Sequence, residues 1–193
     1  MKTVLMVSFG LLSFASHARS DCISIYSDTN VYSCHLYTLV EPPSINTVYI
    51  IHSLNTGSTA SQFKVIDNSG LFPASQQTPY LALGTWNTDL SLAYGSCIVG
   101  DHVLMTLNFF WFGVPLTDCD HTLRVAPAPT SPIPGSIAVA DCAAPRHNIE
   151  EGSEGWGLYV RSDSHTCLVG CGCEDFHVAV DAATWGAVKA LYR

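Results

Sequence analysis

The chain is dominated by short runs rich in Val, Ile, Tyr, Phe and Thr, and turn-forming residues separate each run from the next. Side chains of these types favour strands because they pack well on a pleated, half-buried surface. Residues 47–54 are typical, since they alternate with the period of two expected of a strand, and turn residues follow at 55–57. The recurrence predicts an all-β fold, an antiparallel sandwich or barrel, and argues against alternating strands and long helices.

The expected strands are spread along the whole of the chain that follows the N-terminal segment. They cover residues 22–26, 32–40, 47–54, 62–66, 81–86, 91–98, 103–112, 122–125, 136–142, 157–161 and 176–180. A chain of this length can bury a full hydrophobic core, so one domain is the default expectation.

Residues 125–136 carry four prolines and therefore cannot pair as a central strand. An extended or polyproline-like conformation is expected instead. The segment is either a linker to a small second domain or a crossover between the two sheets of one sandwich, and the sequence leaves both interpretations open.

The N-terminus has the features of a cleavable secretory signal. Lys2 provides the positive start, and the apolar run over 4–15 is long enough for a signal peptide but too short to span a bilayer. Small residues allow cleavage after Ala18 or after Ser20. We therefore expect a signal peptide over 1–20, no transmembrane segment, and a mature protein that is secreted or held at the cell surface or in the periplasm.

The charge balance limits the classes of partner. Sixteen acidic residues face eight basic ones, the formal net charge is −8, and no basic cluster is present. This balance argues against binding to nucleic acid or to an anionic membrane surface. Charged residues make up only 12% of the chain, about half of the usual ~25%, as suits an extracellular β protein.

All eight cysteines follow the expected cleavage site: Cys22, Cys34, Cys97, Cys119, Cys142, Cys167, Cys171 and Cys173. An even number in an exported chain predicts a disulfide framework, although eight cysteines allow 105 connectivities. A hairpin bridge between Cys22 and Cys34 is plausible, because both lie on consecutive strand-like runs joined by a turn. Cys171 and Cys173 are two residues apart, which favours separate partners.

Part of this set has an alternative interpretation as a zinc site. Potential soft ligands are concentrated in one short stretch: His165, Cys167, Cys171, Cys173 and His177. Thiolate and imidazole are the ligands that Zn²⁺ prefers, but the spacing matches no standard C-x2-C pattern. In an oxidising compartment bridges are the better prediction, and we expect no cofactor.

Four aromatic residues follow one another at 109–112 within an expected strand. Alternate rings then point to opposite faces of the sheet. If only one face is covered by the core, the outer rings form a platform for sugar rings or for another apolar partner, with Phe110, Phe112 and Trp111 as candidates. In the alternative, the strand is central and covered on both faces.

No catalytic motif stands out. The acidic clusters at 118–121 and 150–154 lack the loop spacing of an EF-hand, so solvated loop charge is expected rather than a calcium site. Ser96 lacks the G-x-S-x-G context of a nucleophile elbow. The glycines of 170–173 neither open an expected helix nor precede a phosphate-binding lysine.

The C-terminal residues change in character. In 183–193, Thr184 can act as an N-cap, and Trp185, Val188 and Leu191 recur at a spacing of three. This pattern predicts a short amphipathic helix that needs a surface to dock against. The expected organisation is a signal peptide over 1–20, a sandwich domain over 21–182 and this terminal element over 183–193.

Four stretches carry a resemblance that covers most of the expected mature chain: TVYIIHSLNTGSTASQFKV at 47–65, PYLALGTWNTDLSLAYGSC at 79–97, SIAVADCA at 136–143 and TWGAVKALYR at 184–193. Together they resemble an uncharacterised group of small exported proteins from environmental bacterial genomes. The resemblance implies a signal peptide, an immunoglobulin-like or cohesin-like β-sandwich, and a terminal T-W-G-x-V-K-x-L-Y-R signature. It implies no activity, and the signature fits either a packing element or a sorting signal.

These features together predict a non-catalytic binding, adhesion or structural module at or outside the cell surface. Its partner is unknown, and a glycan or an envelope component is the candidate class. The alternative is a secreted hydrolase that uses acidic residues, which would require two carboxylates facing each other across a cleft.

Overall fold

The computed structural model describes residues 22–30, 33–38, 41–143, 148–154 and 157–163, and within these ranges every regular element is a strand. The strands are β1 (Cys22–Tyr26), β2 (His35–Tyr37), β3 (Ser44–Asp67), β4 (Phe72–Gln77), β5 (Leu81–Thr85), β6 (Asp89–Trp111), β7 (Thr122–Ala126), β8 (Ile137–Ala140), β9 (Ile149–Glu154) and β10 (Leu158–Arg161). The all-β prediction is confirmed for this part. The signal segment over 1–20, the strand over 176–180 and the helix over 183–193 lie outside it.

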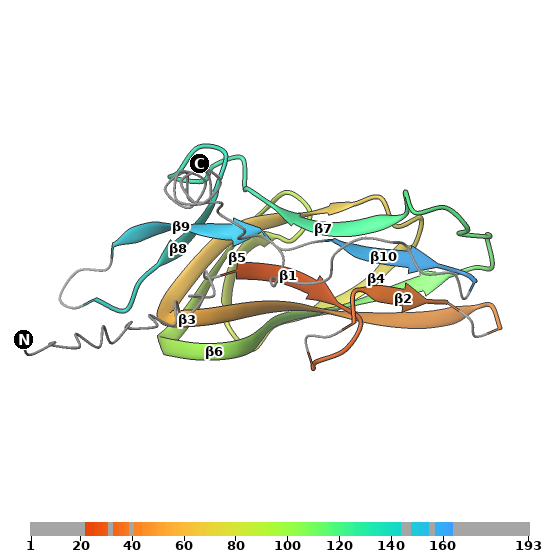
Figure 1. Ribbon diagram of the computed structural model, residues 1–193, viewed down its shortest axis with the longest axis horizontal. Coiled ribbons are helices and arrows are strands. Elements are labelled where there is room, and N and C mark those ends of the chain that lie inside the picture. Colours follow the sequence, from red (N-terminus) through yellow and green to blue (C-terminus); the bar gives the residue numbers. More distant parts are fainter. Residues whose placement is uncertain (1–21, 31–32, 39–40, 144–147, 155–156, 164–193) are drawn as a thin grey trace, which may run out of the picture.

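Two long strands form the framework of the molecule. β3 has 24 residues, β6 has 23, and they pair antiparallel along most of their length. Both strands bend at one end of the molecule, where the pairing register shifts between Leu54 and Ser58 (Figure 1). The separate strands expected over 47–54 and 62–66 are therefore halves of one strand.

Glycine makes this continuity possible. Gly57 lies at the register shift with φ 88°, a left-handed conformation that other residues rarely adopt. A side chain at Gly57 would also lie only 3.0 Å from the carbonyl oxygen of Ile98 on the partner strand. The turn expected at 55–57 is thus a bulge that bends β3 without ending it.

The strands form two layers that share β3. The first layer contains β5-β6-β3-β8-β9 with β1 paired to both β9 and β3, and β4 pairs with β6. The second layer has the order β3-β7-β10-β2. Most strand pairs are antiparallel, as expected of an antiparallel sandwich, but β1–β9 and β2–β10 are parallel. These partners are far apart in sequence, so no tight hairpin dictates their direction.

Both layers contribute to one apolar core. Phe63 and Phe109 are fully buried in β3 and β6, while Leu123 and Leu158 approach from β7 and β10. The ring of Phe109 meets that of Trp86 edge to face at 5.9 Å between centroids. Each large apolar side chain buried in this way contributes about 1.5–3 kcal/mol relative to an exposed one.

The proline-rich segment over 127–136 joins β7 of the second layer to β8 of the first. It is folded onto the body of the protein, since Ala128 is buried and Thr130 Oγ1 accepts a hydrogen bond from Gln62 Nε2 of β3. The segment therefore occupies the position of a crossover between layers.

Candidate binding surfaces

The outward face of the first layer carries two rows of cross-strand neighbours at one end of β6. The first row is Leu81, Ala93, Ala60, Ala140 and Ile149, and the second is Leu83, Ser91, Gln62, Ala138 and Glu151. Residues two apart on a strand point to the same side, so both rows lie on one face of β5-β6-β3-β8-β9.

Small side chains in the middle of these rows and large ones at their edges hollow this face into a groove. Its floor includes Ala60, Ala93 and Ala140, whereas Leu81 and Leu83 at one edge are 70% and 69% exposed. The cavity measures about 240 Å³ and is lined by Ala60, Ser61, Gln62, Leu81, Leu83, Ser91, Leu92, Ala93, Pro132, Ala138, Val139, Ala140 and Ile149. None of these residues is charged.

A polar cluster closes one end of the groove. Gln62 Nε2 donates hydrogen bonds to Asp89 Oδ1 at 2.9 Å and to Thr130 Oγ1 at 2.8 Å, and the Thr130 hydroxyl donates to Asp89. The hydrogen bond from Thr130, followed by that from Gln62, lowers the pKa of Asp89. Pro132 reaches the groove because this cluster ties the proline-rich segment to β3 and β6.

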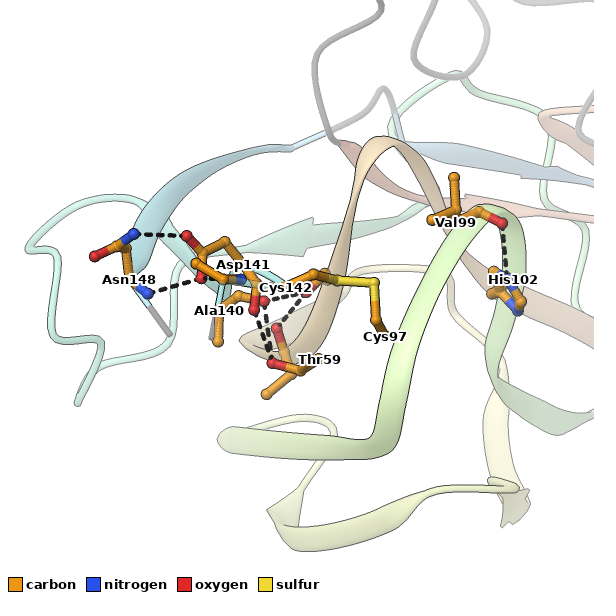
Figure 2. Close-up of a disulfide and its surroundings, with 11 residues drawn as sticks. Thr59, Cys97, Val99, His102, Ala140, Asp141, Cys142 and Asn148 are labelled. Carbon is orange, nitrogen blue, oxygen red and sulfur yellow. Dashed lines mark hydrogen bonds between the residues drawn. A yellow bond between two sulfur atoms is a disulfide. The ribbon is translucent and has the colours of Figure 1, made fainter. Parts of the chain in front are cut away.

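A disulfide fixes the side of the groove that β8 forms. Cys97 lies at the bend of β6, Cys142 follows β8, and their Cα atoms are 5.5 Å apart (Figure 2). The Thr59 hydroxyl donates to the carbonyl oxygens of Ala140 and Asp141 beside the bridge. The end of β8 is therefore held against both long strands.

The carboxylate of Asp141 organises the connection from β8 to β9. It accepts hydrogen bonds from the backbone N–H of Asn148 at 2.8 Å and from its side-chain amide at 2.7 Å (Figure 2). The backbone carbonyl of Asn148 in turn accepts a hydrogen bond from the N–H of Asp141. These contacts position Ile149, the first residue of β9, at the edge of the groove.

The five cysteines in the part of the chain that the structure describes are all disulfide-bonded. Among the described strands, β1 pairs with β3 and β9 whereas β2 pairs with β10, so these two strands do not pair as the hairpin expected to carry a Cys22–Cys34 bridge. The remaining candidates Cys167, Cys171 and Cys173 lie outside the described ranges, as does the zinc alternative over 165–177. Within those ranges, no group of three His, Cys, Asp or Glu residues is placed to hold a metal ion.

A second surface lies at the other end of β6. Phe72, Phe110 and Ile45 are cross-strand neighbours on β4, β6 and β3, and the ring of Phe112 contacts both phenylalanines of this row. The centroids are 5.2 Å apart for Phe72 and Phe112, and 6.0 Å for Phe110 and Phe112. We call the outward side chains of Ile45, Phe72, Phe110 and Phe112 the aromatic face.

The aromatic run at 109–112 alternates between the two faces of the sheet. Phe110 and Phe112 are 36% and 59% exposed, whereas Phe109 is buried. Trp111 belongs to the core side, at 8% exposure, and its indole N–H donates to the carbonyl oxygen of Val114. Including Trp111 in the platform is therefore a mistake that the strand's own alternation could have revealed.

No sequence pattern pointed to Phe72 as a member of this face. Its strand begins Phe-Pro and continues with polar residues, and it enters the aromatic face only because β4 pairs with β6. A bulge between Pro73 and Ser75 keeps Phe72 and Ser75 in consecutive rows on the same side.

A buried polar network lies in β3 and β6 between the two surfaces. The Tyr94 hydroxyl donates to Ser61 Oγ at 2.6 Å, and His52 Nδ1 lies 3.0 Å from the same hydroxyl. Burial raises the pKa of Tyr94, so this hydroxyl stays protonated. All three side chains are buried, which makes this network a structural link between the long strands.

Among the described residues, no helix has the length and apolar character that a membrane span requires. No family model matches the chain, and no curated protein matches it significantly.

Two solved structures to which the chain is similar are cohesin modules. The sixth cohesin of scaffoldin B from Acetivibrio cellulolyticus, solved with a mutant dockerin, is 14% identical, with 75% of this chain and 99% of that one covered at a TM-score of 0.48. A cohesin module of a family 33 glycoside hydrolase from Clostridium perfringens is 8% identical, with 74% and 98% covered at a TM-score of 0.45.

Proposed function

We propose that the protein is an exported, non-catalytic binding module that acts at or outside the cell surface and holds an amphipathic helix of a partner protein in the groove. Export rests on the signal expected over 1–20, and the bonded cysteines fit an oxidising compartment. The immunoglobulin-like or cohesin-like type of sandwich, and membership of the exported bacterial group, are parts of the same proposal.

The observation that carries the proposal is the apolar groove itself. Large side chains such as Leu81 and Leu83 are normally covered, and a contiguous apolar surface of this kind is typical of a contact with another molecule. The alanine floor allows the backbone of a partner to approach closely, while the edges supply apolar contacts on both sides.

The dimensions favour a helix. Neighbouring strands lie about 4.8 Å apart, so β5 and β9, separated by four such steps, lie about 19 Å apart. A helix with its side chains is about 10–12 Å across and can therefore rest between the two edges. No residue that lines the groove is charged, so the buried side of that helix must be apolar.

The groove offers little for acid and base chemistry. A hydrolase of the alternative type needs two carboxylates across a cleft, and no aspartate or glutamate lines this one. Asp89 at its end has a lowered pKa, the opposite of the shift that a general acid needs.

The test compares Ala93→Arg, which places a charge on the groove floor, with Phe112→Ala at the other end of β6. Envelope proteins captured on immobilised wild-type protein are identified by mass spectrometry, produced in pure form and titrated by calorimetry. We expect a partner whose affinity falls at least about tenfold with Ala93→Arg and is unchanged with Phe112→Ala.

Two results would contradict the proposal. The first is a purified partner that binds the Ala93→Arg variant as tightly as the wild type. The second is a wild-type dimer in light scattering that Ala93→Arg converts to a monomer, because the occupant of the groove would then be a second copy of this chain.

A further inference from the structure

The aromatic face exposes rings that the fold does not need for its core. Phe72, Phe110 and Phe112 contact one another and remain exposed, although the same strand buries Phe109 and Trp111 on its other side. Mutual contact between the rings restricts their orientations before any ligand arrives. Such preorganised aromatic surfaces lower the entropy cost of binding.

Two polar rows continue the same side of β4, β6 and β3. The row next to the rings is Ser75, Asn108 and Thr47, and the row after it is Gln77, Thr106 and Tyr49. Rings, amides and hydroxyls thus occupy one continuous side of three paired strands.

Asn108 is held in a fixed orientation at the centre of these rows. Its Oδ1 accepts a hydrogen bond from the Thr47 hydroxyl at 2.8 Å, and its Nδ2 donates to Ser75 Oγ at 2.9 Å. A side-chain amide has two donor hydrogens and two acceptor positions, so each atom keeps capacity for one more hydrogen bond. Both groups can be presented to the hydroxyls of a ligand.

Charge selects among the ligands that such a surface could bind. The side chains of the aromatic face and of the two polar rows are all uncharged, while the chain as a whole has a formal net charge of −8. An acidic polymer would be repelled by the negative net charge and has no cationic side chain to bind on this surface, and a cationic polymer has no carboxylate to bind here. An uncharged ligand with apolar C–H faces and many hydroxyls matches both the rings and the amides.

The area fits an extended ligand. Three strands span about 10 Å across, and three rows at two-residue intervals span about 14 Å along them. This area accommodates several consecutive sugar rings.

We propose that the aromatic face is a binding site for an uncharged polysaccharide. Sugar rings stack on Phe110 and Phe112, and their hydroxyls bond to Asn108 and its neighbours. This site lies at the opposite end of β6 from the groove, so polysaccharide binding can be tested independently of what binds in the groove.

The experiment is affinity electrophoresis of the folded, disulfide-bonded protein in gels containing a neutral β-1,4-glucan, β-1,3-glucan, xylan, mannan or soluble chitin derivative, or the acidic polymers polygalacturonate and alginate. The wild type should be retarded by at least one neutral polymer and by neither acidic one. Phe110→Ala and Phe112→Ala should each weaken the affinity at least about tenfold, and Asn108→Ala severalfold. Ala93→Arg, which changes only the groove, should bind as the wild type does.

Thermal unfolding of each variant establishes that it is folded, and the exposure of Phe112 makes its replacement the safer of the two ring variants. The proposal is overturned if no neutral polymer retards the wild type, if both ring variants bind as tightly as the wild type, or if the acidic polymers bind better. If no polysaccharide binds but a purified protein partner binds in the groove, the proposed function stands and only the polysaccharide site is withdrawn.

Discussion

Replacing both members of the Cys97–Cys142 bridge by serine should destabilise the fold while preserving its topology. The bridge joins the bend of β6 to the residues after β8 across a sequence separation of 45. Substituting both cysteines leaves no single thiol from this pair to attack the other bridges. The backbone contacts of Thr59 and Asn148 around the site remain available to hold β8 and the start of β9.

The size of the effect follows from the loop that the bridge closes. For a separation of 45 residues, the restriction of the unfolded chain amounts to about 4 kcal/mol at 25 °C. The other disulfide-bonded cysteines already constrain that chain, so a loss of about 2–4 kcal/mol is expected. For a domain of this size, each kcal/mol corresponds to about 2–4 °C, and the unfolding midpoint should fall by about 4–16 °C.

Thermal unfolding followed by circular dichroism, without reductant, measures this difference. Ser96→Ala is the matched control, because Ser96 is the exposed neighbour of Cys97 and its replacement should change stability by less than about 0.5 kcal/mol. Guanidinium titration provides the free energy independently. A double variant that unfolds within about 1 °C of the wild type would refute the loop-entropy reasoning.

Three further outcomes are expected. Phe109→Ala should cost about 3–5 kcal/mol of unfolding free energy because its ring is fully buried, while Phe110→Ala, one residue along and partly exposed, should cost far less; equal losses in denaturant titrations would contradict the assignment of faces. Gly57→Ala should destabilise more than Gly100→Ala, since both have φ near 90° but only at Gly57 would the new side chain meet the carbonyl of Ile98; the reverse order of midpoints would contradict the tight approach at the bulge. Because the pKa of Asp89 is lowered in the folded state, its carboxylate contributes to the free energy of unfolding fully above the ordinary pKa of 3.8, and this contribution is lost as the pH falls through the lower pKa of the folded state. Asp89→Asn should therefore make the loss of stability at acidic pH less steep. An unchanged pH dependence of stability would show that the carboxylate gains nothing from Gln62 and Thr130.

Local patterns revealed much of the strand content. The expected strand over 22–26 coincides with β1, and those over 81–86, 122–125 and 157–161 differ from β5, β7 and β10 by one residue at an end. These strands have the β-branched and apolar composition on which such predictions depend.

Strands that depend on their partners escaped prediction. β4 contains Pro73 and a run of polar residues, and β9 is acidic and contains Gly152. Neither composition favours a strand by itself, and both segments are extended because β6, β8 and β1 provide hydrogen-bonding partners.

The aromatic face and the groove differ in how far each could be predicted from the sequence. The alternation of one strand, which is local information, predicts that Phe110 and Phe112 share a face, and the structure shows that this face is the exposed one. The groove depends on the register of five strands between Leu81 and Ile149, and the Cys97–Cys142 pair is one choice among many connectivities. Long-range pairing of this kind leaves no periodic signal in the sequence.

The bridge after β8 also has a mechanical consequence. β8 is four residues long and pairs with β3 through only three residues, so under tension it would be the first part of the groove floor to peel away. The covalent link from Cys142 to Cys97 directs such a pull into β6, which is paired with β3 along most of its length. A partner seated on the alanine floor would therefore be tethered to the two longest strands, and the groove would yield only under a force that shears them apart.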